Sequence, residues 1–101
     1  MLTRAEAMEI VSSAIAKINS ENDADHQVVV FEERTIERDL VFGFFCNTKK
    51  YKETLNVRHA LIGIGPIIVS RRTRAVAVCG SNPPYIYCVD EYERRAAAGE
   101  W

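Results

Sequence analysis

The sequence of 101 residues has no long apolar run and no excess of charge of one sign. Its 13 Lys and Arg residues are balanced by 14 Asp and Glu residues, whereas a nucleic-acid-binding domain normally carries a basic excess. No apolar stretch approaches the roughly 18 residues of a transmembrane helix, and the first residues interleave charges where a signal peptide would be apolar. We therefore expect a single cytoplasmic domain over residues 1–101 that binds neither nucleic acid nor a membrane.

Histidine and cysteine are few and dispersed. The histidines are His26 and His59, and the cysteines are Cys46, Cys79 and Cys88. Their odd number and the lack of a C-x-x-C pair argue against a disulfide framework or a zinc site. Free cysteines in apolar stretches pack as small hydrophobic side chains, and no histidine signature surrounds Cys46 to activate a nucleophile. The prediction is a non-enzymatic protein with no metal and no cofactor.

Two segments have the periodicity of amphipathic helices. Over residues 3–20, apolar side chains recur at three- and four-residue spacing after a capping box that begins at Thr3. A second helix is predicted over residues 84–96. The segment 80–84 before it should break a strand and supply a cap residue and a proline for the first turn. Gly99 lies beyond the expected end of this helix.

Four segments between these helices are dense in β-branched and aromatic residues, which is typical of strands. The predicted strands are residues 27–33, 40–48, 67–69 and 75–79. The first two should pair as an antiparallel hairpin across a polar link, and residues 49–61 should be loop with a helical turn. The predicted fold is α+β with the order α-β-β-β-β-α, an antiparallel four-stranded sheet packed by two helices.

A glycine pair precedes the third predicted strand, in the segment Gly63-Ile64-Gly65-Pro66. A phosphate-binding loop would need a longer glycine motif in a strand-to-helix context, and Pro66 removes one of the backbone donors that such a loop uses. We interpret the segment as a turn in which Gly63 and Gly65 meet a need for positive φ or for close backbone approach. Valine at either position should cost about 1–3 kcal/mol.

The predicted strands are apolar at consecutive positions, so both faces of the sheet must be covered by a helix on each side, by the loop 49–61 or by another chain. Alternation along the second strand predicts two sets: Leu40, Phe42, Phe44 and Cys46 on one face, Val41 and Phe45 on the other. Two helices are large enough to cover one face together. If they do, the opposite face should drive formation of a homodimer or bind an apolar partner surface.

Charged residues gather at two places in the sequence. One is the expected hairpin tip between the third and fourth strands, with Arg71, Arg72 and Arg74. Three arginines there would suit phosphates or an acidic protein partner, and a solvated turn is the alternative interpretation. The other place holds Glu32, Glu33, Glu37 and Asp39. These seven residues are the candidate partner-binding residues, because charged patches steer the encounter of two proteins.

Several short motifs are shared with one known family. They are Gly63-Ile64-Gly65-Pro66-Ile67-Ile68-Val69, Gly80-Ser81, Pro84, Tyr92-Glu93, the aromatic strand from Phe42 to Thr48, and Tyr51-Lys52-Glu53-Thr54. By these motifs the chain resembles the immunity protein 35 domain family, also called YrhB-like. The motifs span about half of the chain, and the order of elements covers almost all of it.

The chain departs from the family pattern at a few places. Phe42 stands where the family has tryptophan, and Ile64 stands in place of the asparagine of its usual G-N-G-P motif. Ser70 and Arg74 replace its usual Asp and Gly. The motif positions to which the resemblance gives structural roles are Phe42, Gly63, Gly65, Pro66, Gly80, Pro84 and Tyr92.

The resemblance implies a bacterial protein that works by binding and uses no cofactor. The family is predicted to neutralise polymorphic toxins encoded beside it, and one branch is described as chaperone-like. The expected function is therefore that of an immunity protein that binds and neutralises a cognate toxin domain. The alternative is a small chaperone-like protein that holds unfolded clients on an apolar face of the sheet.

Overall fold

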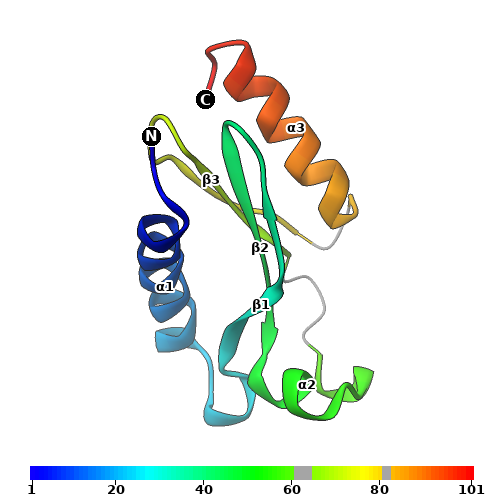
Figure 1. The fold of residues 1–101 in the computed structure, drawn as a ribbon. Coiled ribbons are helices and arrows are strands. Elements are labelled where there is room, and N and C mark those ends of the chain that lie inside the picture. The colour runs from blue at the N-terminus through cyan, green and yellow to red at the C-terminus, as the bar shows by residue number, and fades with distance from the viewer. Residues whose placement is uncertain (61–64, 81–82) are drawn as a thin grey trace.

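The computed structural model describes residues 1–60, 65–80 and 83–101. The elements are α1 (Arg4–Glu21), η1 (Ala24–His26), β1 (Val28–Glu37), β2 (Val41–Thr48), α2 (Lys49–Thr54), η2 (Val57–His59), β3 (Ile67–Ser70), β4 (Val76–Val78) and α3 (Tyr85–Ala97). The strands form one antiparallel sheet in the order β1-β2-β3-β4 (Figure 1). The predicted α+β fold is confirmed, and the helical turn expected after the second strand is the short helix α2.

Local sequence accounts for the start of α1. The Thr3 hydroxyl accepts the Glu6 N–H at 3.2 Å, and the Glu6 carboxylate accepts the Thr3 N–H at 3.0 Å. These are the two reciprocal bonds of a capping box. The helix then buries the stripe formed by Ala7, Val11 and Ile15.

Helix α3 differs from the prediction at its start and agrees with it at its end. The segment 80–84 supplies the cap residue, which is Pro84, and this proline makes no side-chain cap bond. The helix begins after it at Tyr85, so the prediction of a proline in the first turn was wrong. At the other end, Gly99 has φ +77°. Its N–H donates to the Ala96 carbonyl at 3.1 Å, and the Glu100 N–H donates to the Arg95 carbonyl at 2.9 Å. This pair of bonds is a Schellman motif, for which glycine is the favoured residue.

The predicted β1–β2 hairpin is confirmed, but β1 runs further than expected. Phe31 lies opposite Phe45, and the next paired residues are Ile36 and Gly43. Between these pairs β1 contains more residues than β2, which is a bulge. The segment that was predicted to be a polar link is therefore mostly strand, because β1 extends to Glu37.

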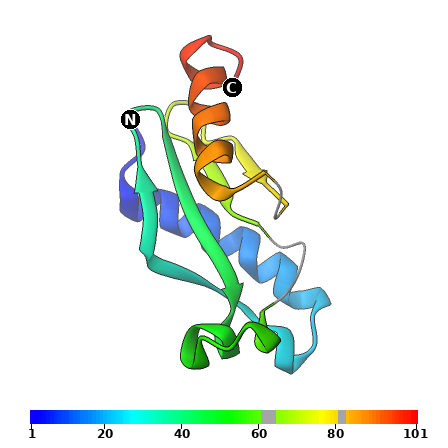
Figure 2. The same cartoon turned by 90° about the vertical axis from the view of Figure 1, so that its right-hand side faces the viewer.

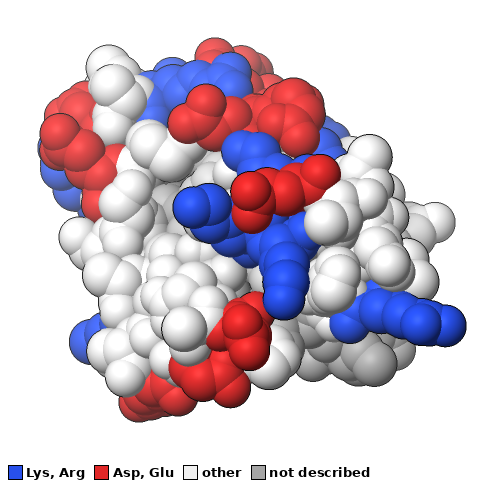
Figure 3. All heavy atoms as spheres, turned by 90° about the horizontal axis from the view of Figure 1, so that it is seen from below, with Lys and Arg blue, Asp and Glu red and all other residues white. Residues whose placement is uncertain are grey.

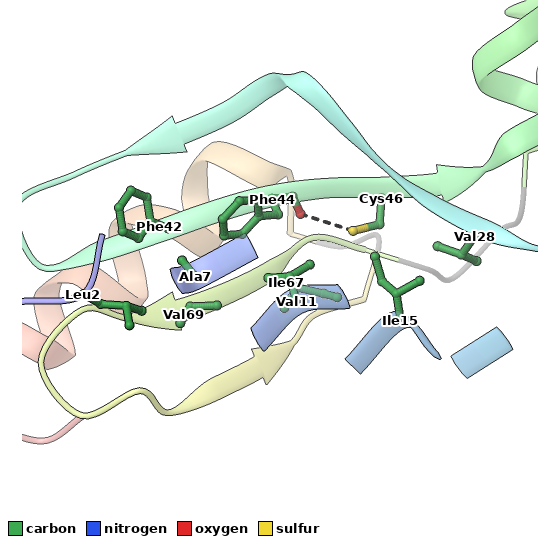
Figure 4. Close-up of a cluster of buried hydrophobic side chains, with 10 residues drawn as sticks. All are labelled: Leu2, Ala7, Val11, Ile15, Val28, Phe42, Phe44, Cys46, Ile67 and Val69. Carbon is green, nitrogen blue, oxygen red and sulfur yellow. Dashed lines mark hydrogen bonds between the residues drawn. The ribbon is translucent and has the colours of Figure 1, made fainter. Parts of the chain in front are cut away.

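A cluster of buried side chains fills the space between α1 and the sheet (Figure 4). Its members are Leu2, Ala7, Val11, Ile15, Val28, Phe42, Phe44, Cys46, Ile67 and Val69. Alternate residues of β2 supply the centre of this cluster, as the strand period of two requires.

A second cluster lies under α3. Helix α3 covers the face of the sheet opposite to α1 (Figures 1 and 2). The cluster contains Val41 and Ile68 from the strands and Cys88, Val89 and Ala96 from α3. Its buried residues alternate along β2 and β3 with those of the first cluster, so each sheet face has its own helix.

Of the alternatives left open for these faces, the structure has a helix on each side of the sheet. The condition under which a homodimer was expected, both helices on one face, is not met. One expectation about these faces was wrong. Leu40 packs with the α3 cluster and not with Phe42. It precedes the first residue of β2, so the alternation of that strand does not extend to it. Phe45 points to the α3 side as expected, with its ring 6.0 Å from that of Tyr85.

Candidate partner-binding surface

The β1–β2 turn, the β3–β4 turn and both chain ends meet at one end of the molecule (Figure 1). Arg71 joins them. Its N–H donates to the Leu40 carbonyl at 2.9 Å, Nη1 to the Arg38 carbonyl at 2.8 Å and Nε to the Leu2 carbonyl at 3.2 Å. Its guanidinium also lies 4.6 Å from the centre of the Phe42 ring. Arg71 is thus engaged within the protein, where it positions the residues around it.

Because Arg71 uses the planar fork of its guanidinium, Arg71→Lys should lower the free energy of unfolding by about 1–3 kcal/mol. Urea denaturation followed by circular dichroism measures this loss. The matched control is Arg72→Lys, because Arg72 is exposed and its one hydrogen bond within the described residues is to the backbone oxygen of Trp101, at 3.0 Å. The control should change the free energy by less than about 0.5 kcal/mol. Equal losses in the two variants would contradict the role given to Arg71.

The other two predicted arginines remain near the surface. Arg72 is exposed, and Arg74 forms an exposed ion pair with Glu6 at 3.2 Å. Arg74 also has φ +65°, a conformation that favours glycine. Glycine is the residue that the resembled family has at this position.

The four predicted acidic residues are all exposed but do not form one group. Glu37 ends β1 and Asp39 lies in the turn after it, so both lie at the end that carries the arginines. Glu32 and Glu33 lie farther back along β1, in its bulged part. The structure therefore brings only half of the predicted acidic cluster to the predicted arginines.

The aromatic part of this end was not predicted from the sequence. The rings of Tyr92 and Trp101 are 4.6 Å apart, and the Arg95 guanidinium lies 4.9 Å from the Tyr92 ring. The Schellman turn after α3 reverses the chain and returns Trp101 to the helix, which no helical spacing could indicate. We call the combined group the terminal surface: Glu37, Asp39, Arg72, Arg74, Tyr92, Arg95 and Trp101.

Ion pairs fix α3 against the β1–β2 turn behind this surface. Arg38 Nη1 lies 3.0 Å from Asp90 and 3.1 Å from Glu93. Partial burial acts to lower the pKa of Arg38, but the hydrogen bonds to the two carboxylates outweigh burial and raise that pKa. The guanidinium of Arg38 therefore keeps its positive charge at neutral pH.

Charge of both signs is mixed over the opposite end as well. Viewed from the end that bears α2, Lys and Arg side chains are interleaved with Asp and Glu (Figure 3). This matches the balance of charges in the sequence. A partner of this protein must therefore match a pattern of charges, because neither sign dominates the whole molecule.

Four of the family-motif positions lie where packing is close. Phe42 is buried under α1, Gly65 and Pro66 are buried before β3, and Tyr92 packs against the α3 cluster. Gly80 is exposed after β4 and Pro84 caps α3. Gly63 lies outside the described residues.

Cys46 is a poor nucleophile in this environment. It is buried in the α1 cluster, and burial raises the pKa of its thiol to about 12. Within residues 1–60, 65–80 and 83–101, no group of His, Cys, Asp and Glu is placed to hold a metal ion.

Burial should also protect Cys46 from reagents. With Cys79→Ser and Cys88→Ala removing the other thiols, an aromatic disulfide reagent should label Cys46 at least about a hundredfold more slowly in the folded protein than in urea. The release of the reagent's chromophore measures both rates. Rapid labelling without denaturant would contradict the buried placement.

Comparisons of the chain with protein-family models, with curated proteins and with solved structures find no match. In the described part of the chain, no helix is long and apolar enough to cross a membrane.

Proposed function

We propose that this protein is a non-enzymatic immunity protein that binds a cognate toxin domain and neutralises it. The terminal surface carries the proposal. It combines tryptophan, tyrosine and arginine, the residue types that most often dominate the binding energy of protein–protein interfaces. The Trp101 ring and the Arg95 guanidinium each lie against the Tyr92 ring, and these contacts reduce the conformational freedom that is lost on binding.

Charge on the same surface supports recognition of a protein. Arg72 contacts only a backbone oxygen within the described residues, so its charge can pair with a carboxylate of a partner. Glu37 and Asp39 add the opposite sign nearby. Such a pattern favours one complementary partner and rejects others, which an immunity protein requires.

The resemblance to the immunity family also supports the proposal, because two of the motif residues lie in closely packed positions. Gly65 is closely approached by the backbone of residues 79–80, and Phe42 is fully buried. Arg74 has the left-handed conformation that a family glycine would adopt easily.

The chaperone-like alternative has less support. It would place unfolded clients on a bare apolar face of the sheet, and α1 and α3 cover the two faces. Among the described residues, the large apolar side chains that are exposed are dispersed over several segments: Met1, Leu55, Val57, Val76, Val78, Ile86 and Tyr87.

Co-expression with the toxin domain encoded beside this gene tests the proposal. The wild-type protein should co-purify with the toxin domain and restore growth of cells that produce it. Arg72→Glu should weaken the complex by about tenfold or more, because it puts a carboxylate where the partner is expected to be acidic. The matched control is Arg58→Glu, an exposed arginine of η2 at the opposite end of the molecule. Absence of any complex with the wild-type protein would overturn the proposal.

A further inference from the structure

Strand β1 lies at an edge of the sheet, and an asparagine side chain closes the first part of that edge. The Lys49 N–H donates to the Gln27 carbonyl on the β2 side at 2.9 Å, so antiparallel alternation directs the backbone groups of Val28 and Val30 outward. Asn19 binds both groups of Val28: Oδ1 accepts its N–H at 2.7 Å, and Nδ2 donates to its carbonyl at 3.0 Å. Asn19 thus completes the ladder at Val28 as a neighbouring strand would.

Beyond Val28, long cationic side chains donate hydrogen bonds to the outward carbonyl groups of β1. Lys52 Nζ donates to the Val30 carbonyl at 3.2 Å, and Arg4 Nη2 donates to the Glu32 carbonyl at 3.3 Å. Both contacts are exposed to solvent, where the net energy of such pairing is small and the side chains are flexible. Both cations can therefore leave the edge without unfolding any element.

A groove of about 450 Å³ lies beside this edge, between α1 and β1. Met8, Ser12 and Ile15 line it from α1, and Val28 and Val30 line it from β1. The groove is wide enough for an apolar side chain of a chain segment that lies along β1. The groove lies next to outward-facing backbone groups of β1. When a peptide adds to a sheet edge as a further strand, hydrogen bonds to such backbone groups give affinity, and a pocket for a side chain gives specificity.

Charge around the groove favours an acidic residue at one end. Lys52 follows Lys49 and Lys50 in α2, and the only acidic residue of that helix is Glu53. At the other end, Glu32 already lies beside Arg4. A carboxylate of a bound segment is therefore best placed at the Lys52 end.

We propose that the edge from Val30 to Glu32 accepts an extended segment of a partner protein as a fifth strand, with an apolar side chain in the α1–β1 groove and a carboxylate at Lys52. Backbone N–H groups of the segment replace the cations on the outward carbonyls, and the Val30 N–H gains an acceptor. Lys52 then exchanges its hydrogen bond to a neutral carbonyl for an ion pair with a carboxylate, which is stronger. The inference rests on the proposed function for the identity of the partner.

The probe is a fluorescein-labelled, end-blocked peptide of alternating valine and glutamate, titrated with the protein at low salt and followed by fluorescence anisotropy. Saturable binding is expected. Ser12→Trp fills the groove and should weaken binding by about tenfold or more, and Lys52→Gln should weaken it by about threefold. The matched control is Ser13→Trp, the next exposed residue of α1 and not a lining residue, which should change affinity by less than about twofold. The same peptide with lysine for glutamate should bind about tenfold more weakly.

Absence of saturable binding to the wild-type protein, or equal affinities of the Ser12→Trp and Ser13→Trp variants, overturns the inference. The proposed function fails by a different result, the absence of a complex with the toxin domain. A toxin complex that forms equally well with both serine variants would leave the proposed function standing and overturn strand addition.

Discussion

Replacing Gly65 by alanine is expected to lower the free energy of unfolding by about 3 kcal/mol or more. A Cβ at this position would lie 2.0 Å from the Gly80 carbonyl oxygen and 2.4 Å from that of Cys79. These are backbone atoms, so no side-chain rotation can relieve the overlap. The Cys79 N–H also donates to the Pro66 carbonyl at 2.9 Å, which holds the two segments together. Urea denaturation measures the loss.

The matched control for this variant is Gly80→Ala, on the other side of the same contact. A Cβ at Gly80 would meet nothing within 4 Å among the described residues, so the free energy should change by less than about 0.5 kcal/mol. Of the two roles considered from sequence, the structure supports close backbone approach at Gly65. Losses of equal size in the two variants would contradict this explanation.

Phe44→Ala is expected to lower the free energy of unfolding by about 3–5 kcal/mol. Phe44 is fully buried in the middle of the cluster beneath α1, with its ring 6.1 Å from the Phe42 ring. Removing the ring loses the free energy gained by moving it from water into the core, and it leaves a cavity. The strands are paired with their neighbours, so they cannot easily move to close that cavity. Thermal and urea denaturation should both show the loss.

Tyr87→Ala is the control for the loss of an aromatic ring. Tyr87 is 62% exposed on α3, so its removal should change the free energy of unfolding by about 0.5 kcal/mol or less. A loss below about 1 kcal/mol for Phe44→Ala would contradict the central position of that ring.

Elements with a local cause could be predicted from the sequence. The capping box at Thr3 and the glycine reversal at Gly99 each depend on residues within one or two helical turns, and both are present. The bulge in β1 could not be predicted, because it arises from the pairing of Phe31 and Ile36 with residues of another strand. A bulge depends on how two strands match, and neither strand contains that information alone.

The candidate site was predicted in part, for the same reason. The arginine turn and the acidic residues of β1 are visible as charge in the sequence. The engagement of Arg71 is not, because its acceptors at Leu2 and Arg38 are distant in the sequence and meet only where the turns and the N-terminus converge. The sequence likewise does not show that the Val30 carbonyl points outward and can accept a partner's N–H, because this depends on the position of β1 at the edge of the sheet.

By itself, the sequence determined the two long helices, the four strands and their order, though not the full length of β1, and it required cover on both faces of the sheet. Periodicity and local hydrogen bonding decide the first, and the consecutive apolar residues of β2 decide the second. Only the tertiary structure decided that α1 covers Phe42 and Phe44 while α3 covers Val41 and Ile68. The free energy gained by burying apolar side chains depends on how much apolar area is removed from water, and not on which segment covers it. The chain connections and the packing of the whole fold therefore decide which helix covers each face.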